Sequence, residues 1–312
     1  MDVRGKHIFI GLSGGVDSAV SAALLKRAGA EVTGVFIKGW YPPAFGPCAW
    51  AAERRDVMRV AARLQIPFLT LDAGTEYKKG VIDYLLAEYR VGHTPNPDVM
   101  CNREVKFGAF YRFAKAAGAD AIATGHYRSG EKDQSYFLWA VPKEILAATL
   151  FPVGNLEKDE VRALAKRFNL SVAEKKDSQG VCFLGNRSME EFLRAELGDD
   201  NPALLYTIGQ RISRPHGPWY VVGKNDVAKK EITVSRTRIS GAHSVQFKDA
   251  NWHAESARAT EAQYRYRGPR VKGHVEKDRF VSTEPLPEIP VPGQSTVFYH
   301  NGELVGGGTI VA

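Results

Sequence analysis

The chain contains few cysteines and no long apolar run. Its 312 residues include three cysteines, Cys48, Cys101 and Cys182, and no two of them form a C-x-x-C pair. This spacing excludes a disulfide-rich scaffold and gives no zinc-finger signature. The apolar part of residues 1–12 is too short for a secretory signal, and no segment approaches the length of a membrane span. We therefore expect a soluble, cytoplasmic protein with reduced thiols and no membrane partner.

The charge balance is moderately basic. Lys and Arg number 42 against 35 Asp and Glu, which gives a net charge of +7 and a pI of about 9.2. The hydrophobic fraction of 44% and the charged fraction of 25% are typical of a globular protein, and the length predicts two or three domains. A surplus of positive charge favours phosphate-bearing partners such as nucleic acids, although a charge of this size also serves solubility alone.

The first third of the chain alternates between apolar strands and helical patterns. We predict short buried strands at 6–12, 31–37, 67–72 and 120–125, and helices at 17–29, 49–65, 77–90 and 105–118. Such an alternation predicts right-handed crossovers and an α/β fold with a doubly wound parallel sheet. Ligands of such sheets bind beyond the carboxyl ends of the strands.

The remaining chain changes character twice. Residues 127–210 are predicted to be mostly helical. From about residue 218 short β-rich runs follow, and the Asn301-Gly302 pair between the last two runs predicts a hairpin in a small β-barrel. The proline-rich segment 282–293 is predicted to be a loop.

The first predicted strand is followed by GLSGGVDS, residues 11–18, which opens the first helix. Its adjacent glycines let the backbone turn sharply and bring N–H groups close to a ligand. Asp17 and Ser18 fall at the helix start, where free N–H groups and the helix dipole favour an anion. The segment is neither a Walker loop nor a G-x-G-x-x-G fingerprint, and a plain strand-to-helix turn is the alternative. SGGVDS resembles the PP-loop of ATP pyrophosphatases, which implies adenylation of a substrate oxygen with release of pyrophosphate.

Two of the cysteines lie in polar, loop-like surroundings. Cys101 belongs to TPNPDVMCNREVKF, residues 94–107, where two prolines exclude a regular helix over the first four residues. Cys182 belongs to KKDSQGVCFLG, residues 175–185, whose two lysines favour the reactive thiolate form of a neighbouring thiol. Unrelated, partly buried cysteines are the alternative, and for Cys48 we adopt that interpretation.

Seven motifs follow one another along the chain. They read SGGVDS, GHTPNPDVMCNREVKF, ATGHY, KDQSYFL, KKDSQGVCF, YTIGQR and PGQSTVFYHNGELVGGGTI. Together they resemble the bacterial tRNA-specific 2-thiouridylase family, whose members thiolate the wobble uridine of certain tRNAs, and the resemblance runs nearly end to end. It implies a PP-loop ATP-binding catalytic domain at 1–140, a central helical or mixed domain carrying Cys182 at 141–217, and a tRNA-contacting β-barrel at 218–312.

The resemblance also implies where ATP binds, with Mg²⁺ expected alongside it. ATP is expected at the PP-loop, at the backbone of Ile37 and at Gly125. Family members usually carry Met where this chain has Ile37, and a backbone contact survives that change. The PP-loop residues are Gly11, Leu12, Ser13, Gly14, Gly15, Val16, Asp17 and Ser18.

Two thiols carry the chemistry that the resemblance implies. ATP activates the uridine C2 oxygen as an adenylate, a persulfide on Cys182 supplies the sulfur, and Cys101 then attacks the persulfide to leave a Cys101–Cys182 disulfide. Asn96, Pro97 and Asp98 are implied to meet the target base, with Asp98 suited to general acid or base chemistry. An ordinary turn is the alternative for Asn-Pro-Asp. The open alternative for the chemistry is a [4Fe–4S] cluster held by Asp98, Cys101 and Cys182, and no other metal site is assigned.

Three basic and aromatic segments, 128–137, 209–220 and 261–274, are candidates for RNA contact. Interleaved Tyr and Arg suit base stacking and phosphate contact, while the last segment also fits a plain barrel strand. The resemblance implies the tRNAs for Lys, Glu and Gln as substrates, and a persulfide donor protein or cysteine desulfurase as partner. The residues to which it assigns tRNA contact are His126, Lys132, Asp133, Gln134, Arg265, Tyr266 and Gln294.

The chain departs from the family pattern in two places. A segment after Tyr127 is shortened, and a glycine- and histidine-containing stretch before Tyr206 is missing. Both departures bear on the positioning of tRNA rather than on the chemistry. Two other functions compete with thiolation: a PP-loop synthetase that adenylates a small carboxylate or amide, and an inactive tRNA-binding protein.

Overall fold

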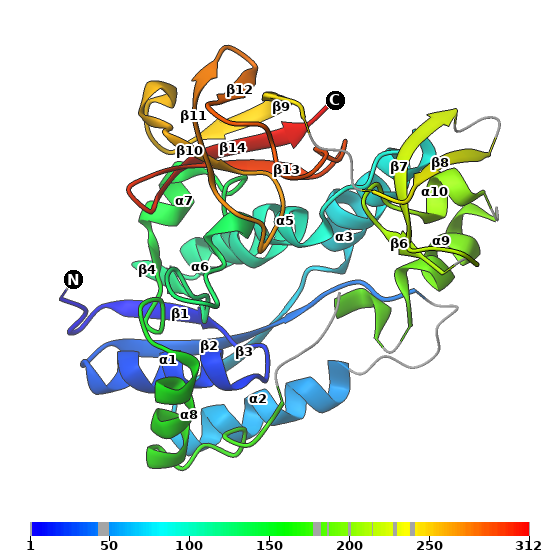
Figure 1. The fold of residues 1–312 in the computed structure, drawn as a ribbon. Coiled ribbons are helices and arrows are strands. Elements are labelled where there is room, and N and C mark those ends of the chain that lie inside the picture. The colour runs from blue at the N-terminus through cyan, green and yellow to red at the C-terminus, as the bar shows by residue number, and fades with distance from the viewer. Residues whose placement is uncertain are drawn as a thin grey trace. The chain divides into compact units, whose positions relative to one another are not determined.

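The computed structural model describes most of the chain, in eight stretches. Cys48, Asp177 and Gln179 lie outside the described residues, and Cys182 is described for its backbone only. The chain divides into two compact units, Met1–Gly80 with Met100–Gly185 and Val81–Val99 with Asn186–Ala312 (Figure 1). The three-domain division with boundaries at 140 and 217 stays a prediction. The described stretches are 2–42, 50–176, 182–185, 187–198, 201–213, 215–226, 230–237 and 241–311.

The first unit contains a five-stranded sheet in the order β3-β2-β1-β4-β5. All neighbouring strands are parallel, which confirms the predicted α/β doubly wound fold. The strand order reverses its direction between β1 and β4, and ligands of such sheets bind at this point. The strands are β1 (His7–Gly11), β2 (Glu31–Lys38), β3 (Phe68–Asp72), β4 (Ala121–Ala123) and β5 (Thr149–Leu150).

Helices cover both faces of this sheet. Figure 1 shows α1 (Val16–Arg27), α2 (Trp50–Leu64) and α8 (Lys158–Arg167) on one face and α6 (Phe110–Ala116) on the other. Because α1 packs against the sheet and against α8, its side chains are buried on most sides rather than along one stripe. The predicted helices at 17–29 and 49–65 are confirmed with shifts of one or two residues at their ends.

Two predicted helices are interrupted by π-helical segments. The periodicity of apolar residues does not distinguish π from α geometry over six to eight residues, so the sequence showed continuous helices. Such segments occur frequently at functional sites. The helix predicted at 77–90 consists of α3 (Gly74–Tyr77), η2 (Lys78–Asp83) and α4 (Tyr84–Arg90), and the one predicted at 105–118 consists of η3 (Asn102–Ala109) and α6.

Residues 127–210 are less helical than predicted. Their helices are short or separated by turns, and a strand of the sheet, β5, lies among them. The α-helices of this region are α7 (Lys143–Ala147), α8, α9 (Met189–Leu197) and α10 (Pro202–Leu205).

The second unit contains a closed barrel in the order β10-β11-β12-β9-β14-β13. Phe247, Phe280 and Phe298 fill its interior, where they are almost fully buried. The predicted Asn301-Gly302 hairpin is confirmed, because φ is 48° at Asn301 and 83° at Gly302, as a type I′ turn requires. The strands are β9 (Ser244–Trp252), β10 (Glu261–Gln263), β11 (Val271–Glu276), β12 (Arg279–Ser282), β13 (Ser295–His300) and β14 (Glu303–Ile310).

The second unit also holds a separate three-stranded antiparallel sheet, β6-β7-β8. The barrel strands begin at Ser244, so the first two β-rich runs after residue 218 do not belong to the barrel as predicted. They pair with β6 instead, a strand of two residues that the sequence pattern did not reveal. The strands are β6 (Arg211–Ile212), β7 (Trp219–Asp226) and β8 (Glu231–Ser235).

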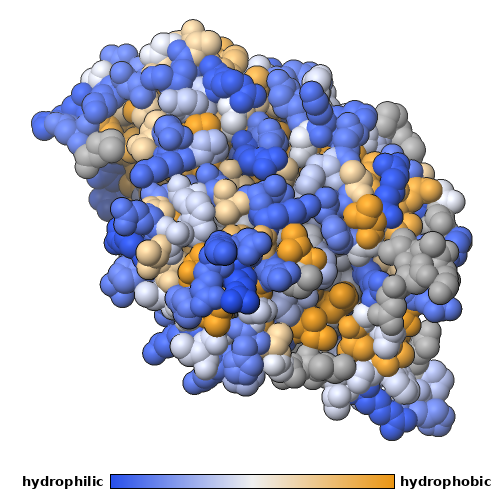
Figure 2. All heavy atoms as spheres, turned by 90° about the horizontal axis from the view of Figure 1, so that it is seen from above, coloured by the Kyte–Doolittle hydropathy of each residue, from blue (hydrophilic) through white to orange (hydrophobic). Residues whose placement is uncertain are grey.

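The surface of the described residues is mainly polar. Figure 2 shows charged and polar side chains over most of the face in view, with apolar side chains in smaller groups. Met58, Leu69 and Val91 are the large apolar side chains that are exposed in the described stretches. Within these same stretches no helix combines the length and apolar character needed to cross a bilayer.

Candidate active site

The loop after β1 folds around the start of α1. Gly14 has φ +77°, a conformation that favours glycine, and Gly15 is the N-cap residue of α1. The Ser13 hydroxyl accepts a hydrogen bond from the Gly15 N–H (3.3 Å), and the Ser18 hydroxyl accepts one from the Ser13 N–H (3.3 Å). No side chain caps α1, so the N–H groups of its first turn remain available to an anion.

Gly125 brings a second loop against the PP-loop. It follows β4, the neighbour of β1, and a Cβ atom at this position would lie 2.7 Å from the Ser18 nitrogen. Only glycine permits this approach between two backbones. Ile37 lies close by, since its Cδ1 would be 3.8 Å from a Cβ atom on Gly11. The structure thus brings together the PP-loop, Ile37 and Gly125, the residues expected to bind ATP.

The carboxylate of Asp17 has two partners that the sequence did not reveal. The Tyr127 hydroxyl donates to its Oδ1 (2.6 Å), and the Lys158 ammonium lies 2.7 and 2.9 Å from its two oxygens. Lys158 is the first residue of α8, and its side chain is 13% exposed. These partners are 110 and 141 residues away in sequence, so no local pattern connects them with the PP-loop.

The first turns of α2 lie against the PP-loop at Gly14. The Glu53 carbonyl oxygen would be 3.0 Å from a Cβ atom on Gly14, and burial raises the pKa of the Glu53 carboxyl. The ammonium of Lys175 pairs with Asp56 at 2.7 Å. Lys175 therefore anchors the segment before Cys182 to α2, and its predicted effect on the Cys182 thiol stays a prediction.

The Asn-Pro-Asp motif forms a helix start rather than an ordinary turn. Asn96 Oδ1 accepts hydrogen bonds from the N–H groups of Asp98 (3.1 Å) and Val99 (3.4 Å), so Asn96 acts as the N-cap of α5 (Pro97–Cys101). Pro97 occupies the first helical position, where its missing N–H costs nothing. Cys101 is the last residue of α5, and it is buried, with 4% of its surface exposed.

Within the first unit, the segments that carry the two cysteines converge on α3. The backbone of Cys182 opens a 3₁₀ turn, Cys182–Leu184, and the buried Phe183 ring meets the Tyr77 ring of α3 at 6.2 Å. The same helix packs against η3, which begins directly after Cys101. Tyr77 also lies against Gly39, just after β2, where a Cβ atom would be 3.1 Å from the ring.

The ATGHY and KDQSYFL motifs also lie close to the segment after Cys101. Asn102 is 2% exposed, and its Nδ2 donates to the Phe137 carbonyl at 3.0 Å. The ring of His126 contacts Phe107 of η3 (5.4 Å), and its Nδ1 lies 3.0 Å from the Thr124 hydroxyl. Burial, with a smaller contribution from Lys106, lowers the pKa of His126 to about 3, so the imidazole is neutral at physiological pH.

The predicted RNA-contact residues Lys132, Asp133 and Gln134 form a tight loop after Tyr127. The Gln134 side-chain oxygen accepts from the Tyr127 N–H (3.1 Å), and Asp133 Oδ1 accepts from the Ser135 N–H (2.8 Å). Two of the three side chains therefore shape the loop, while Lys132 is exposed.

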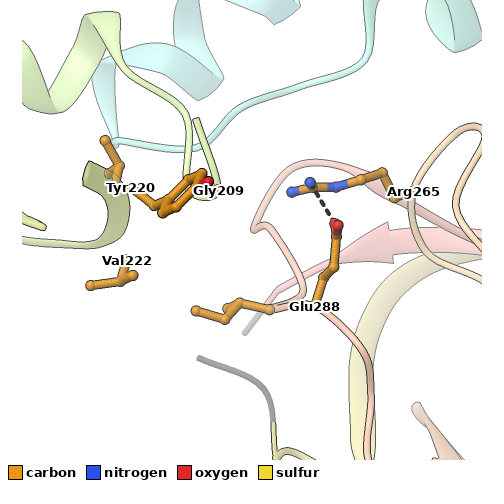
Figure 3. Close-up of a pocket in the computed structure, with 7 residues that line it drawn as sticks. Gly209, Tyr220, Val222, Arg265 and Glu288 are labelled. Atoms are coloured by element: carbon orange, nitrogen blue, oxygen red, sulfur yellow. Dashed lines mark ion pairs between the residues drawn. The ribbon is translucent and has the colours of Figure 1, made fainter. Parts of the chain in front are cut away.

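In the second unit, the basic side chains of the predicted RNA-contact segments engage partners of their own. Figure 3 shows a small pocket with Arg265 and Glu288, which form an ion pair, on one side and Gly209 and Tyr220 on the other. The guanidinium lies 2.5 Å from the Glu288 carboxylate and donates to the Ile208 carbonyl at 3.4 Å. Arg265 thus joins the barrel to the YTIGQR turn.

The neighbouring aromatic residues differ in exposure. Tyr264 is 4% exposed and belongs to the barrel core, whereas Tyr266 is half-buried and lies under the Arg267 guanidinium (5.4 Å). The Arg270 guanidinium covers the Tyr299 ring at 3.7 Å. Of these residues, Tyr266 with Arg267 offers the arrangement best suited to stacking on a base.

The described side chains include no group of three or more His, Cys, Asp and Glu that could hold a metal ion. The side chain of Cys182 is outside that set, so the predicted cluster ligands Asp98, Cys101 and Cys182 are not tested by this finding.

Comparison with known proteins gives strong matches over both units. The family described as "tRNA methyl transferase HUP domain" matches residues 6–186, and "Aminomethyltransferase beta-barrel domain" matches residues 242–310. The tRNA-specific 2-thiouridylase MnmA of Streptococcus thermophilus (strain CNRZ 1066) is 38% identical, over 97% of this chain and 95% of its own. The chain belongs to the tRNA-specific 2-thiouridylase family. A second 2-thiouridylase of this family, from Streptococcus pyogenes serotype M3 (strain ATCC BAA-595 / MGAS315), is 39% identical over 97% of this chain and 94% of its own.

The two 2-thiouridylases are longer than this chain. The match to the S. thermophilus protein extends over 361 positions, more than the 312 residues of this chain. The S. thermophilus protein therefore carries residues that this chain lacks. Among solved structures, the U34-tRNA thiolase NcsA from Methanococcus maripaludis matches 64% of this chain and 69% of its own, at 17% identity and a TM-score of 0.39. That similarity is too low to bear on the chemistry of this chain.

Proposed function

We propose that this protein is an ATP-dependent tRNA-uridine 2-sulfurtransferase that converts the wobble uridine of tRNA to 2-thiouridine. The observation that carries the proposal is the joint presence, in one compact unit, of a PP-loop at the β1/β4 switch point and two cysteine segments that pack against α3. ATP with Mg²⁺ is expected at the PP-loop, Ile37 and Gly125. We expect the reaction to take place in the cytoplasm.

The first half of the reaction is adenylation. The C2 oxygen of uridine attacks the α-phosphorus of ATP, pyrophosphate leaves, and the oxygen becomes part of an AMP leaving group. The free N–H groups at the start of α1 suit the phosphates. The Lys158 ammonium, held beside the PP-loop by Asp17, is well placed to stabilise the charge that develops on the departing pyrophosphate.

The second half is sulfur transfer. The terminal sulfur of a persulfide on Cys182 attacks C2, and AMP departs with the original oxygen. The Cys101 thiolate then attacks the Cys182 Sγ, and the bond between this Sγ and the sulfur now attached to C2 breaks. The Cys101–Cys182 disulfide forms, and 2-thiouridine leaves with the transferred sulfur. A thiol reductant restores both thiols, and a persulfide donor protein or cysteine desulfurase reloads Cys182. The helix α5, which ends in the buried Cys101, also carries Asp98 for proton transfer at the uracil edge.

The tRNA is expected to meet both units. His126, Lys132, Asp133 and Gln134 would contact it from the first unit, and Arg265, Tyr266 and Gln294 from the second. Because Arg265 is paired with Glu288, a phosphate would have to exchange with that carboxylate. The half-buried Tyr266 ring, which carries the Arg267 guanidinium, is expected to stack on a base. We expect the tRNAs for Lys, Glu and Gln as substrates.

The test is thiolation of unmodified tRNA with ATP and a persulfide donor, followed by nucleoside analysis. We expect 2-thiouridine at the wobble position with wild type, none with Cys182→Ser or Cys101→Ser, and normal product with Cys48→Ser as the matched control. Full activity of Cys182→Ser would refute the mechanism. Iron measured on anaerobically purified protein separates the two routes, because stoichiometric iron that depends on Cys101, Cys182 and Asp98 would replace the two-thiol route by a [4Fe–4S] cluster.

A further inference from the structure

The loop between α4 and α5 precedes the residues proposed to meet the target base. It runs from Gly92 to Asn96 and lies entirely in the second unit. Thr94, at its centre, is 6% exposed, and Asn96 at its end caps α5. The position of Asn96 and Asp98 therefore depends on what holds residues 92–94.

One support comes from β7. The Lys224 ammonium donates to the Gly92 carbonyl (3.0 Å) and to the Thr94 hydroxyl (3.4 Å). Both acceptors are uncharged, and no carboxylate of the described residues forms an ion pair with Lys224. Burial lowers the pKa of Lys224 to about 8. The two hydrogen bonds of this partly buried ammonium tie the loop at Gly92 and Thr94 to β7.

A second support comes from the segment before β13. The Thr94 N–H donates to the Pro292 carbonyl (2.8 Å), and Gln294 Nε2 donates to the Thr94 carbonyl (2.7 Å). Gly293, with φ +90°, allows this contact, since a Cβ atom there would lie 2.9 Å from the Thr94 nitrogen. All three polar groups of Thr94 are thus bonded, the hydroxyl to Lys224 and the two backbone groups to the segment before β13.

We propose that Lys224 is a positioning residue, which holds residues 92–94 so that Asn96 and Asp98 are presented to the target base. The lysine stem reaches from β7 to the loop, and the ammonium fixes two points, one on each side of His93. The three-stranded sheet β6-β7-β8, which lies between α10 and the barrel in the sequence, therefore supports the reaction by positioning this loop. It contributes no residue to the chemistry itself. The identity of the presented ligand as a uridine rests on the proposed function.

The test compares Lys224→Met with Lys248→Met, which removes the same charge from an exposed position of β9. For Lys224→Met we expect kcat for 2-thiouridine formation to fall about 10- to 100-fold, with KM for ATP unchanged. Amide hydrogen exchange over residues 92–99 should rise in the same variant. Lys224→Arg, which keeps the charge and the donors, should recover most of the activity, and Lys248→Met should behave as wild type.

Unchanged kcat and unchanged exchange in Lys224→Met would overturn the proposal, as would a loss confined to KM for ATP. If Lys224→Met does not fold, Thr94→Val removes only the hydroxyl acceptor and should lower kcat in the same direction by about 3- to 10-fold. Absence of 2-thiouridine with wild type would refute the proposed function instead, and the exchange comparison would still decide whether Lys224 holds the loop.

Discussion

Replacing Gly125 by Ala tests whether the close approach of two loops forms the ATP site. The added methyl carbon would lie 2.7 Å from the Ser18 nitrogen and 2.9 Å from the Asp17 carbonyl carbon, whereas ordinary contact begins near 3.4 Å. One backbone must therefore retreat by roughly 0.7 Å, the difference between 3.4 and 2.7 Å. Overpacking of this kind costs about 1–3 kcal/mol, and a displacement near 1 Å at a reacting centre costs up to about 100-fold in rate.

The assay measures 2-thiouridine and AMP formation over a range of ATP concentrations, together with the thermal midpoint. We expect kcat/KM for ATP to fall about 10- to 100-fold, and Tm to fall by about 2–4 °C for each kcal/mol lost. Gly74→Ala is the matched control, because a Cβ atom there meets only the Asp72 side chain at 3.2 Å among close neighbours. Wild-type kcat/KM in Gly125→Ala would refute the placement of ATP against this loop.

Three further predictions concern single side chains. Asn96→Ala removes the cap of α5 and should destabilise that helix by about 0.5–2 kcal/mol, seen as faster amide exchange over its residues, while unchanged exchange would argue against the cap. Lys158→Met should lower ATP-dependent turnover about 100-fold, whereas Lys166→Met, at an exposed position of the same helix, should not. Equal turnover in the two variants would contradict the role of Lys158 in the ATP site. Because the folded-state pKa of His126 (about 3) lies below its unfolded value of 6.5, the unfolded state binds more protons between these values, and stability falls as pH is lowered through this window. His126→Gln should reduce the drop in Tm between pH 7 and pH 5 and the exposed His243→Gln should not, so an undiminished drop in His126→Gln would contradict the shift.

The parallel sheet could be predicted because each of its early strands is a short apolar run between helical patterns. The barrel was harder to predict, because strands such as β9 pair only with segments far along the chain. Trp252 of β9, for example, pairs with Gly306 of β14. The run at 219–235 has the same local pattern as the barrel strands, and only its pairing with β6 separates it from them. Local pattern identifies strands, but the sheet to which a strand belongs depends on long-range contacts.

The same division applies to the site. GLSGGVDS and the cysteine motifs are contiguous in sequence, so their composition pointed to their chemistry. The partners that hold them are not: Tyr127 and Lys158 reach Asp17 from distant elements, and Lys224 reaches Thr94 across 130 residues. Nothing in the residues around Lys224 distinguishes it from a solvated lysine on a strand.

The most direct test of the central claim is a single-turnover transfer from protein loaded with persulfide at Cys182. The loaded protein is mixed with unmodified tRNA and ATP in the absence of any donor. We expect one 2-thiouridine for each persulfide, one AMP and a new Cys101–Cys182 disulfide, found by mass spectrometry. Formation of 2-thiouridine without ATP, or by a Cys182→Ser protein, would contradict this expectation.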